Sequence, residues 1–129
     1  MFKFFRLASL FAYLVYGFVI IMAFWPLMGL QSRQRLEQRY AAGLLRILKV
    51  KVTTQFESEE SRYAVHGPML IYSNHVSWLD IFAFNAVHPV TFIAKSEISQ
   101  WPIAGTLAKR SGTLFIERGK RHAVRDVIH

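Results

Sequence analysis

The chain begins with a long, almost entirely apolar stretch. Residues 7–30 contain no charged side chain, and about 20 apolar residues suffice for a helix to cross a membrane. No polar stripe recurs at the helical period, so these residues do not form the surface helix of a soluble fold. The run is also longer than the roughly 7–15 apolar residues of a signal peptide, and no small-residue cleavage site follows it. We therefore expect residues 1–31 to form a membrane anchor segment.

Two interpretations describe how this anchor enters the membrane. Lys3 and Arg6 come before the apolar run, and Arg33 and Arg35 come after it. Positive charge on both sides gives no orientation by the positive-inside rule. Pro26 is expected to break or kink the helix before the run ends. The segment either spans the membrane or forms a re-entrant hairpin with both ends on the cytoplasmic face.

The next segment, residues 32–50, predicts a basic amphipathic helix. Its apolar positions recur at three- and four-residue steps and make one face: Leu36, Tyr40, Leu44, Ile47 and Leu48. The basic residues of the segment lie largely off that face. A helix of this kind beside a membrane segment either lies on anionic lipid or packs on the following domain with solvated arginines.

Beyond residue 50 the apolar residues occur in short runs. Residues 51–56 alternate as a half-exposed strand does, and 63–65 predict its return strand. Three continuous apolar runs are typical of strands buried on both faces: 69–72, 90–94 and 113–116.

The segments between these runs predict helices over residues 77–87 and 102–109, and 121–129 carry a further helical face. Alternating strands and helices predict an α/β fold, with a mixed, partly parallel sheet and flanking helices. We expect the sheet to be incomplete at its carboxyl end.

The composition of the chain indicates which class of molecule it binds. The formal net charge is +8, and 53% of the 129 residues are hydrophobic. A phospholipid surface is both anionic and apolar, whereas nucleic acid satisfies only the charge, and no nucleic-acid recognition motif is present. The chain has no cysteine, which excludes a disulfide scaffold, a thiolate nucleophile and a cysteine zinc site.

The segment Asn74-His75-Val76-Ser77-Trp78-Leu79-Asp80 carries the candidate chemistry. His75 is expected on a strand-to-helix turn, with Ser77 capping the helix and Asp80 about one turn inside it. Asp80 then reaches back toward the imidazole, an arrangement suited to a general base oriented by a carboxylate. The other interpretation is structural, with His75 as a turn residue and Asp80 as a first-turn acid favoured by the helix dipole. No other histidine stands at a metal-ligand spacing from His75, so we expect no metal.

This segment resembles the NHxSxxD block of the glycerolipid acyltransferases, and the lysophosphatidic acid acyltransferases are the closest type. Two further blocks follow in the same order as in that family. Residues 95–105, Lys-Ser-Glu-Ile-Ser-Gln-Trp-Pro-Ile-Ala-Gly, are similar to the family's lysine, glutamate, proline and glycine segment. Residues 112–118, Gly-Thr-Leu-Phe-Ile-Glu-Arg, are similar to its GxxFIxR block. The resemblance implies that residues 51–129 form a partial acyltransferase catalytic domain.

The resemblance also implies the reaction and the roles of individual residues. An acyl group would pass from acyl-CoA or acyl-carrier protein to the hydroxyl of a lysophospholipid, without a cofactor or a metal. His75 would be the base and Asp80 its orienting partner. The substrate-binding residues would be Arg118, Glu117, Lys95, Asn74 and Ser77, with Arg118 on the acceptor's phosphate and Asn74 and Ser77 shaping the catalytic turn. Lys95 has a second interpretation as an exposed, snorkelling lysine. We expect Gly105 to make a packing contact and not a ligand contact.

The chain departs from the family by absence. The family's later Glu-Gly-Thr-Arg block does not occur in these 129 residues. We therefore expect a fragment of a longer protein or a truncated product, poorly active when isolated. The competing hypothesis is a non-catalytic membrane-surface binding module. The family type suggests the bacterial inner membrane, with the catalytic part on the cytoplasmic side.

Overall fold

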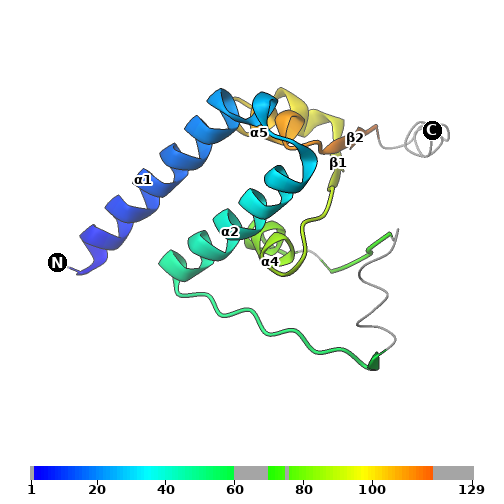
Figure 1. Ribbon diagram of the computed structural model, residues 1–129, viewed down its shortest axis with the longest axis horizontal. Coiled ribbons are helices and arrows are strands. Elements are labelled where there is room, and N and C mark those ends of the chain that lie inside the picture. The colour runs from blue at the N-terminus through cyan, green and yellow to red at the C-terminus, as the bar shows by residue number, and fades with distance from the viewer. Residues whose placement is uncertain (1, 60–69, 75, 118–129) are drawn as a thin grey trace. The chain divides into compact units, whose positions relative to one another are not determined.

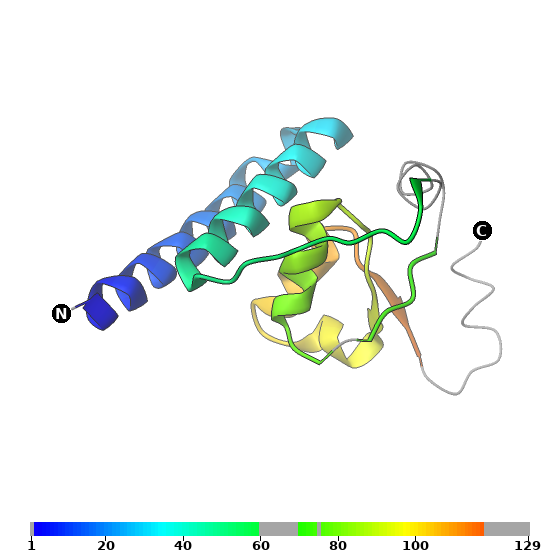
Figure 2. The same ribbon diagram turned by 90° about the horizontal axis from the view of Figure 1, so that it is seen from below.

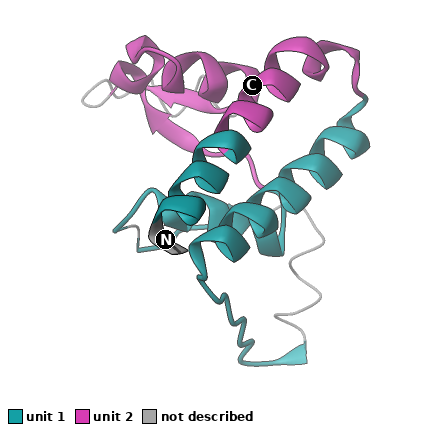
Figure 3. Ribbon diagram, turned by 90° about the vertical axis from the view of Figure 1, so that its left-hand side faces the viewer, with its two compact units in different colours: residues 1–13, 29–89 teal, residues 14–28, 90–129 magenta. Residues whose placement is uncertain are grey.

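The computed structural model of the chain describes residues 2–59, 70–74 and 76–117 (Figure 1). The chain divides into two compact units, coloured separately in Figure 3. Unit 1 comprises residues 1–13 and 29–89, and unit 2 comprises residues 14–28 and 90–129. The long first helix contributes its first half to unit 1 and its second half to unit 2.

Helix α1 runs over Phe2–Ala23 and is followed by the short 3-10 helix η1, Trp25–Leu27. The expected break at Pro26 is confirmed, because the α-helix stops three residues before it. Arg6, which precedes the uncharged run 7–30, lies inside this helix. Within the described part of the chain, α1 is the one helix long and apolar enough to cross a membrane, over Phe4–Ala23.

Helix α2, Leu30–Leu48, confirms the predicted amphipathic helix with a shift of two residues. It begins after Gly29 and ends at Lys49, whose backbone adopts the left-handed conformation with φ 58°. Of the predicted apolar face, Leu44 is buried and the other members are half-buried, whereas Ala41 and Leu45, which the prediction did not include, are buried beside Leu44. One apolar face is therefore covered by protein.

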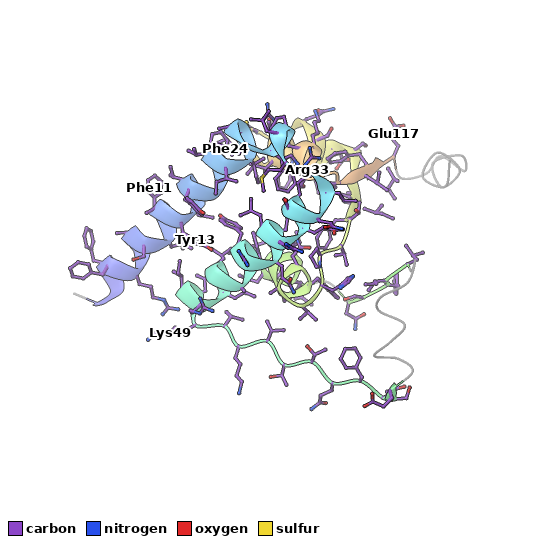
Figure 4. All side chains as sticks on the ribbon, viewed as in Figure 1. Phe11, Tyr13, Phe24, Arg33, Lys49 and Glu117 are labelled. Carbon is purple, nitrogen blue, oxygen red and sulfur yellow. The ribbon has the colours of Figure 1, made fainter. Side chains whose placement is uncertain are left out.

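The first half of α1 is fastened to α2 by two tyrosines. The rings of Tyr13 and Tyr40 are stacked, with centroids 4.8 Å apart and planes inclined by 8°. The hydroxyl of Tyr13 donates to the backbone oxygen of Tyr40 at 3.2 Å, and the hydroxyl of Tyr40 donates to the backbone oxygen of Tyr13 at 3.3 Å. Figure 4 labels Tyr13 on α1. Gly43 makes room for this stack, because a Cβ there would collide with the Tyr13 hydroxyl.

A second tie joins the amino-terminal end of α1 to the last turn of α2. The guanidinium of Arg6 donates to the backbone oxygen of Ile47 at 2.9 Å and also to that of Leu48. The last four carbonyls of a helix have no partner inside the helix, and a cation there also faces the negative end of the helix dipole. Arg6 therefore stabilises the end of α2 from a neighbouring helix.

Helix α4, Leu79–Val87, packs on α2 within unit 1. The side-chain amide of Gln38, on α2, donates to the backbone oxygens of Ala86 at 3.4 Å and Val87 at 3.1 Å. These oxygens lie in the last turn of α4. Gln38 therefore caps the carboxyl end of α4, just as Arg6 caps the carboxyl end of α2. The predicted helix over 77–87 is confirmed, beginning two residues later.

Unit 2 contains a parallel pair of strands, β1 (Ile93–Lys95) and β2 (Leu114–Ile116), with Ile93 opposite Leu114 and Lys95 opposite Ile116. They are joined through the 3-10 helix η2, Ser96–Gln100, and helix α5, Ala104–Arg110. A parallel connection through a helix confirms the predicted α/β pattern in this part of the chain. The strands are shorter than predicted and not buried on both faces, since Ile93 is 45% and Leu114 40% exposed.

Two local contacts hold unit 2 together. Gly105 is buried, and a Cβ there would lie 2.5 Å from the backbone oxygen of Ser99, so η2 and α5 approach each other closely at this point. This supports the packing interpretation of Gly105. The guanidinium of Arg110 donates to the backbone oxygens of Ile21 at 3.3 Å and Met22 at 2.9 Å, which caps the last turn of α1.

Two predicted strands are absent from the described residues. Residues 51–56 are exposed and belong to no strand, and Figure 2 shows the segment as an extended trace. Residues 70–72 are likewise unpaired in the described part, with Leu70 83% and Tyr72 97% exposed. An apolar or alternating run forms a strand only where a neighbour supplies hydrogen-bond partners, and the described residues of unit 1 supply none. The predicted segments 63–65 and 121–129 lie outside the described residues.

Candidate functional site

The turn that leads into α4 is built around the carboxylate of Asp80. Its Oδ2 atom accepts the backbone N–H of Val76 at 2.9 Å and that of Ser77 at 2.8 Å. A carboxylate that accepts two backbone amides fixes the conformation of the loop carrying them. Asp80 thus holds the turn that precedes it, whereas the predicted interaction of Asp80 with the imidazole of His75 stays a prediction, because His75 lies outside the described residues. We call Val76–Asp80 the 76–80 turn.

Ser77 contributes the second interaction of this turn. Its hydroxyl oxygen accepts the backbone N–H of Leu79, the first residue of α4, at 3.2 Å. This satisfies one of the amides that a helix leaves unpaired at its start. The predicted capping role of Ser77 is confirmed, although Trp78 and not Ser77 directly precedes the helix.

The proposed base, His75, lies outside the described residues. Its chain neighbours on both sides are described: Val76 belongs to the 76–80 turn, and Asn74 is exposed. The backbone oxygen of Asn74 accepts the hydroxyl of Ser73 at 2.9 Å. Residues 70–74, the described residues directly before His75, are exposed and form no strand.

An aromatic cluster packs behind the 76–80 turn. Trp78 meets Phe82 edge to face, with ring centroids 5.8 Å apart. Phe82 in turn lies 6.4 Å from Tyr40 on α2. Sequence reasoning placed Tyr40 on the apolar face of its helix but missed this cluster, because its members are far apart along the chain. The 76–80 turn therefore rests on aromatic packing that reaches α2.

The other candidate residues gather at one edge of the sheet in unit 2. Lys95 is the last residue of β1, and Glu117 directly follows β2; both are exposed. Figure 4 shows Glu117 at the end of β2. Because the strands are parallel and Lys95 pairs with Ile116, both side chains belong to the carboxyl edge of the sheet. Arg118, the proposed phosphate ligand, is the next residue in the sequence and lies outside the described residues.

Among the described residues of unit 1, two ionisable groups on α2 have perturbed pKa values. Burial raises the pKa of Glu37 to about 7, against an opposing effect of the nearby Arg33 guanidinium. Burial, followed by the neighbouring Tyr13, raises the pKa of Tyr40 to about 12. Glu37 therefore changes charge close to neutral pH, whereas Tyr40 stays a neutral hydroxyl donor.

The described residues bring together no group of three histidine, aspartate or glutamate side chains that could hold a metal ion. The described part of the site supplies carboxylates, hydroxyls, backbone amides and the ammonium group of Lys95. Such groups orient a base and bind a polar substrate.

Comparison with known proteins gives a consistent set of relatives. The acyltransferase family model matches residues 49–129. The chain is 39% identical over 99 residues to a 1-acyl-sn-glycerol-3-phosphate acyltransferase of Neisseria meningitidis, covering 75% of this chain and 36% of the relative. It is 46% identical over 87 residues to a lyso-ornithine lipid O-acyltransferase of Pseudomonas aeruginosa, covering 67% of this chain and 31% of the relative.

A third relative, a lyso-ornithine lipid O-acyltransferase of Rhizobium meliloti, is 33% identical over 84% of this chain and 36% of its own length. The chain thus spans about a third of the length of the curated relatives it matches. No solved structure matches it.

Proposed function

Because this chain belongs to the acyltransferase family, we propose that its protein transfers a fatty acyl group from a thioester to the free hydroxyl of a lysophospholipid. The donor is acyl-CoA or acyl-carrier protein. The favoured acceptor is lysophosphatidic acid, which makes phosphatidic acid the product. Lyso-ornithine lipid is the alternative acceptor, since relatives bearing both names match the chain.

In the proposed mechanism, His75 takes the proton from the acceptor hydroxyl as that oxygen attacks the thioester carbonyl carbon. The carbon–sulfur bond then breaks, and the leaving thiolate receives the proton from the imidazolium. Asp80 orients the imidazole and stabilises its charged form. The observation that carries this proposal is the Oδ2 atom of Asp80, which binds the two amides directly after His75 in the sequence.

Substrate binding is assigned to the carboxyl edge of the sheet. Arg118 binds the phosphate of the acceptor, because a guanidinium donates two hydrogen bonds at once to phosphate oxygens. Glu117 directly precedes Arg118 in the sequence, and Lys95 ends the strand that pairs with β2. Asn74 and Ser77 shape the turn on either side of the base.

The proposed setting is a membrane surface, because the acceptor is a lipid. Helix α1 supplies an apolar segment of sufficient length, and its side chains Phe4 and Phe11 are 74% and 70% exposed. We place the reaction at the cytoplasmic side of a bacterial inner membrane. Whether α1 spans the membrane or re-enters it does not alter the proposed chemistry.

The test measures thiol release from acyl-CoA and acyl-carrier protein in the protein that carries this chain, with lysophosphatidic acid and lyso-ornithine lipid as acceptors. His75→Ala is expected to lower turnover by about 10²–10⁴-fold, while vesicle binding is unchanged. His88→Ala, at the far end of α4, serves as the matched histidine control. Full turnover in His75→Ala would refute the assignment. Vesicle binding without any acyl transfer in the unmodified protein would favour the membrane-surface module.

A pH profile gives a second test of the base. An unperturbed imidazole has a pKa near ~6.5, so turnover should rise as pH increases through neutrality. A flat profile from about pH 5.5 to 8 would contradict general-base catalysis by His75.

A further inference from the structure

Four aromatic rings form a continuous series from the membrane helix to the 76–80 turn. Tyr13 of α1 stacks on Tyr40 of α2 at 4.8 Å, Tyr40 meets Phe82 of α4 at 6.4 Å, and Phe82 meets Trp78 at 5.8 Å. We call these four residues the aromatic relay. All four lie within unit 1, and the series crosses three helices that are remote in sequence.

Two hydrogen bonds reinforce the stacking of Tyr13 on Tyr40 at the contact between α1 and α2. Tyr40 donates its hydroxyl to the backbone of Tyr13 and accepts the Tyr13 hydroxyl on its own backbone oxygen. Exchanged hydrogen bonds of this kind fix two helices against sliding and rotation, because either movement breaks both. Gly43 allows the rings to approach, since a side chain there would collide with the Tyr13 hydroxyl.

The far end of the relay lies inside the 76–80 turn. Trp78 stands between Ser77, whose amide Asp80 binds, and Leu79, whose amide Ser77 caps. A displacement of the Trp78 ring therefore moves the backbone that these bonds hold. Trp78 is 55% exposed, so a displacement reaches it through its edge-to-face contact with Phe82 and not through a closed core.

We propose that Tyr40 is a positioning residue, which couples the seating of α1 in lipid to the geometry of the 76–80 turn through the aromatic relay. The proposal rests on the proposed function for its effect on catalysis. It adds a residue that touches no substrate and acts through Phe82 and Trp78. An acyltransferase coupled in this way turns over faster when its membrane helix is correctly embedded.

The test compares Tyr40→Leu with Phe11→Leu in the protein that carries this chain, reconstituted in phosphatidylglycerol–phosphatidylethanolamine vesicles. Phe11 is an exposed aromatic residue on α1 and serves as the matched control. Tyr40→Leu is expected to lower kcat about tenfold, because small misplacements of a catalytic group are costly. KM for lysolipid and vesicle binding should stay within about twofold of the original values. Phe11→Leu should leave kcat unchanged.

Hydrogen–deuterium exchange supplies a readout that does not depend on activity. The amides of Val76 and Ser77 are protected by Asp80, so their exchange reports the turn directly. Tyr40→Leu should accelerate this exchange, and Tyr40→Phe, which keeps the ring but loses one of the two exchanged hydrogen bonds, should accelerate it less. If His75→Ala retained full turnover, the proposed function would fail, yet the exchange measurement would still decide the relay.

A double-mutant cycle tests coupling along the relay. Tyr13 and Phe82 each contact Tyr40, so the effects of Tyr13→Leu and Phe82→Leu on kcat should be non-additive by about three- to tenfold. The two effects should become additive in the Tyr40→Leu background. If Tyr40→Leu fails to fold, Phe82→Leu breaks the series one step further on. Normal kcat and normal amide exchange in the folded fraction of these variants would overturn the proposal.

Discussion

The side-chain amide of Gln38 donates to the backbone oxygen of Val87 at 3.1 Å, so a residue of the basic helix α2 caps the end of α4. The opposite end of α4 carries Asp80 and the 76–80 turn. A helix held at its carboxyl end by one neighbour and at its amino end by its own carboxylate has little freedom to tilt. Gln38 therefore belongs to the support of the candidate site, although it lies in α2, the helix that follows α1.

Replacing Gln38 by methionine should lower the free energy of unfolding by about 1 kcal/mol, because it removes hydrogen bonds to two carbonyls of α4. Methionine preserves the length and flexibility of the side chain. Gln34→Met, one turn earlier on the exposed side of α2, is the control. Denaturant unfolding of both variants in the same detergent provides the comparison. Equal stability of the two would mean that the cap contributes nothing.

Asp80→Asn separates the charge of this side chain from its structural role. The amide oxygen of asparagine accepts the N–H groups of Val76 and Ser77, so the turn should persist and their exchange protection should remain. Turnover should nevertheless fall by about 10²–10⁴-fold, because a neutral amide does not stabilise an imidazolium. Asp80→Ala should lose both turnover and protection. Undiminished turnover in Asp80→Asn would show that the negative charge takes no part.

The raised pKa of Glu37 predicts that the fold loses stability as pH rises through the weakly acidic range. The folded state binds this proton up to about pH 7, whereas a glutamate with the ordinary value of 4.5 releases it earlier in the unfolded chain. The folded state therefore holds more protons between these values, and stability decreases with increasing pH across that window. Glu37→Gln should flatten this dependence and raise Tm above pH 7. The measurement is Tm as a function of pH from 4.5 to 8 in the original protein and in Glu37→Gln. Parallel curves of Tm against pH would contradict the prediction.

Gly105→Ala should destabilise unit 2. The added methyl group would lie 2.5 Å from a backbone oxygen of η2, and backbone cannot move aside as a flexible side chain can. A cost of about 1–3 kcal/mol is typical of such overpacking. Gly29→Ala is the control, since nothing lies within 4 Å of the added atom there. If both alanines are tolerated equally, η2 and α5 do not pack as closely as described.

The helices of this chain were predictable because their causes are local. The spacing of Leu44 among its apolar neighbours predicted the buried face of α2, and Pro26 predicted the end of α1. The position of Ser77 before α4 predicted its cap on the first turn of that helix. Each of these inferences uses residues within about one helical turn of one another, where geometry follows from sequence spacing.

The strands and the aromatic relay show where such reasoning stops. Residues 51–56 alternate as a strand does, but alternation does not specify the neighbour that must complete the hydrogen bonds. Tyr13 and Tyr40 stack across a separation of 27 residues, and neither carries a local signal for the other. Their pairing depends on how two helices meet, which the period of each helix alone does not determine.

The cap that Arg110 places on α1 has a consequence for the time at which the protein is made. Arg110 follows Ile21, whose backbone oxygen it binds, by 89 residues. At roughly 5–20 residues per second, a ribosome adds that much chain in about 4–18 s. During this interval the last turn of α1 exists without the guanidinium, and water or lipid headgroups must solvate its carbonyls. The hydrogen bonds that cap the end of α1 therefore form only after Arg110 has been synthesised, long after the helix itself.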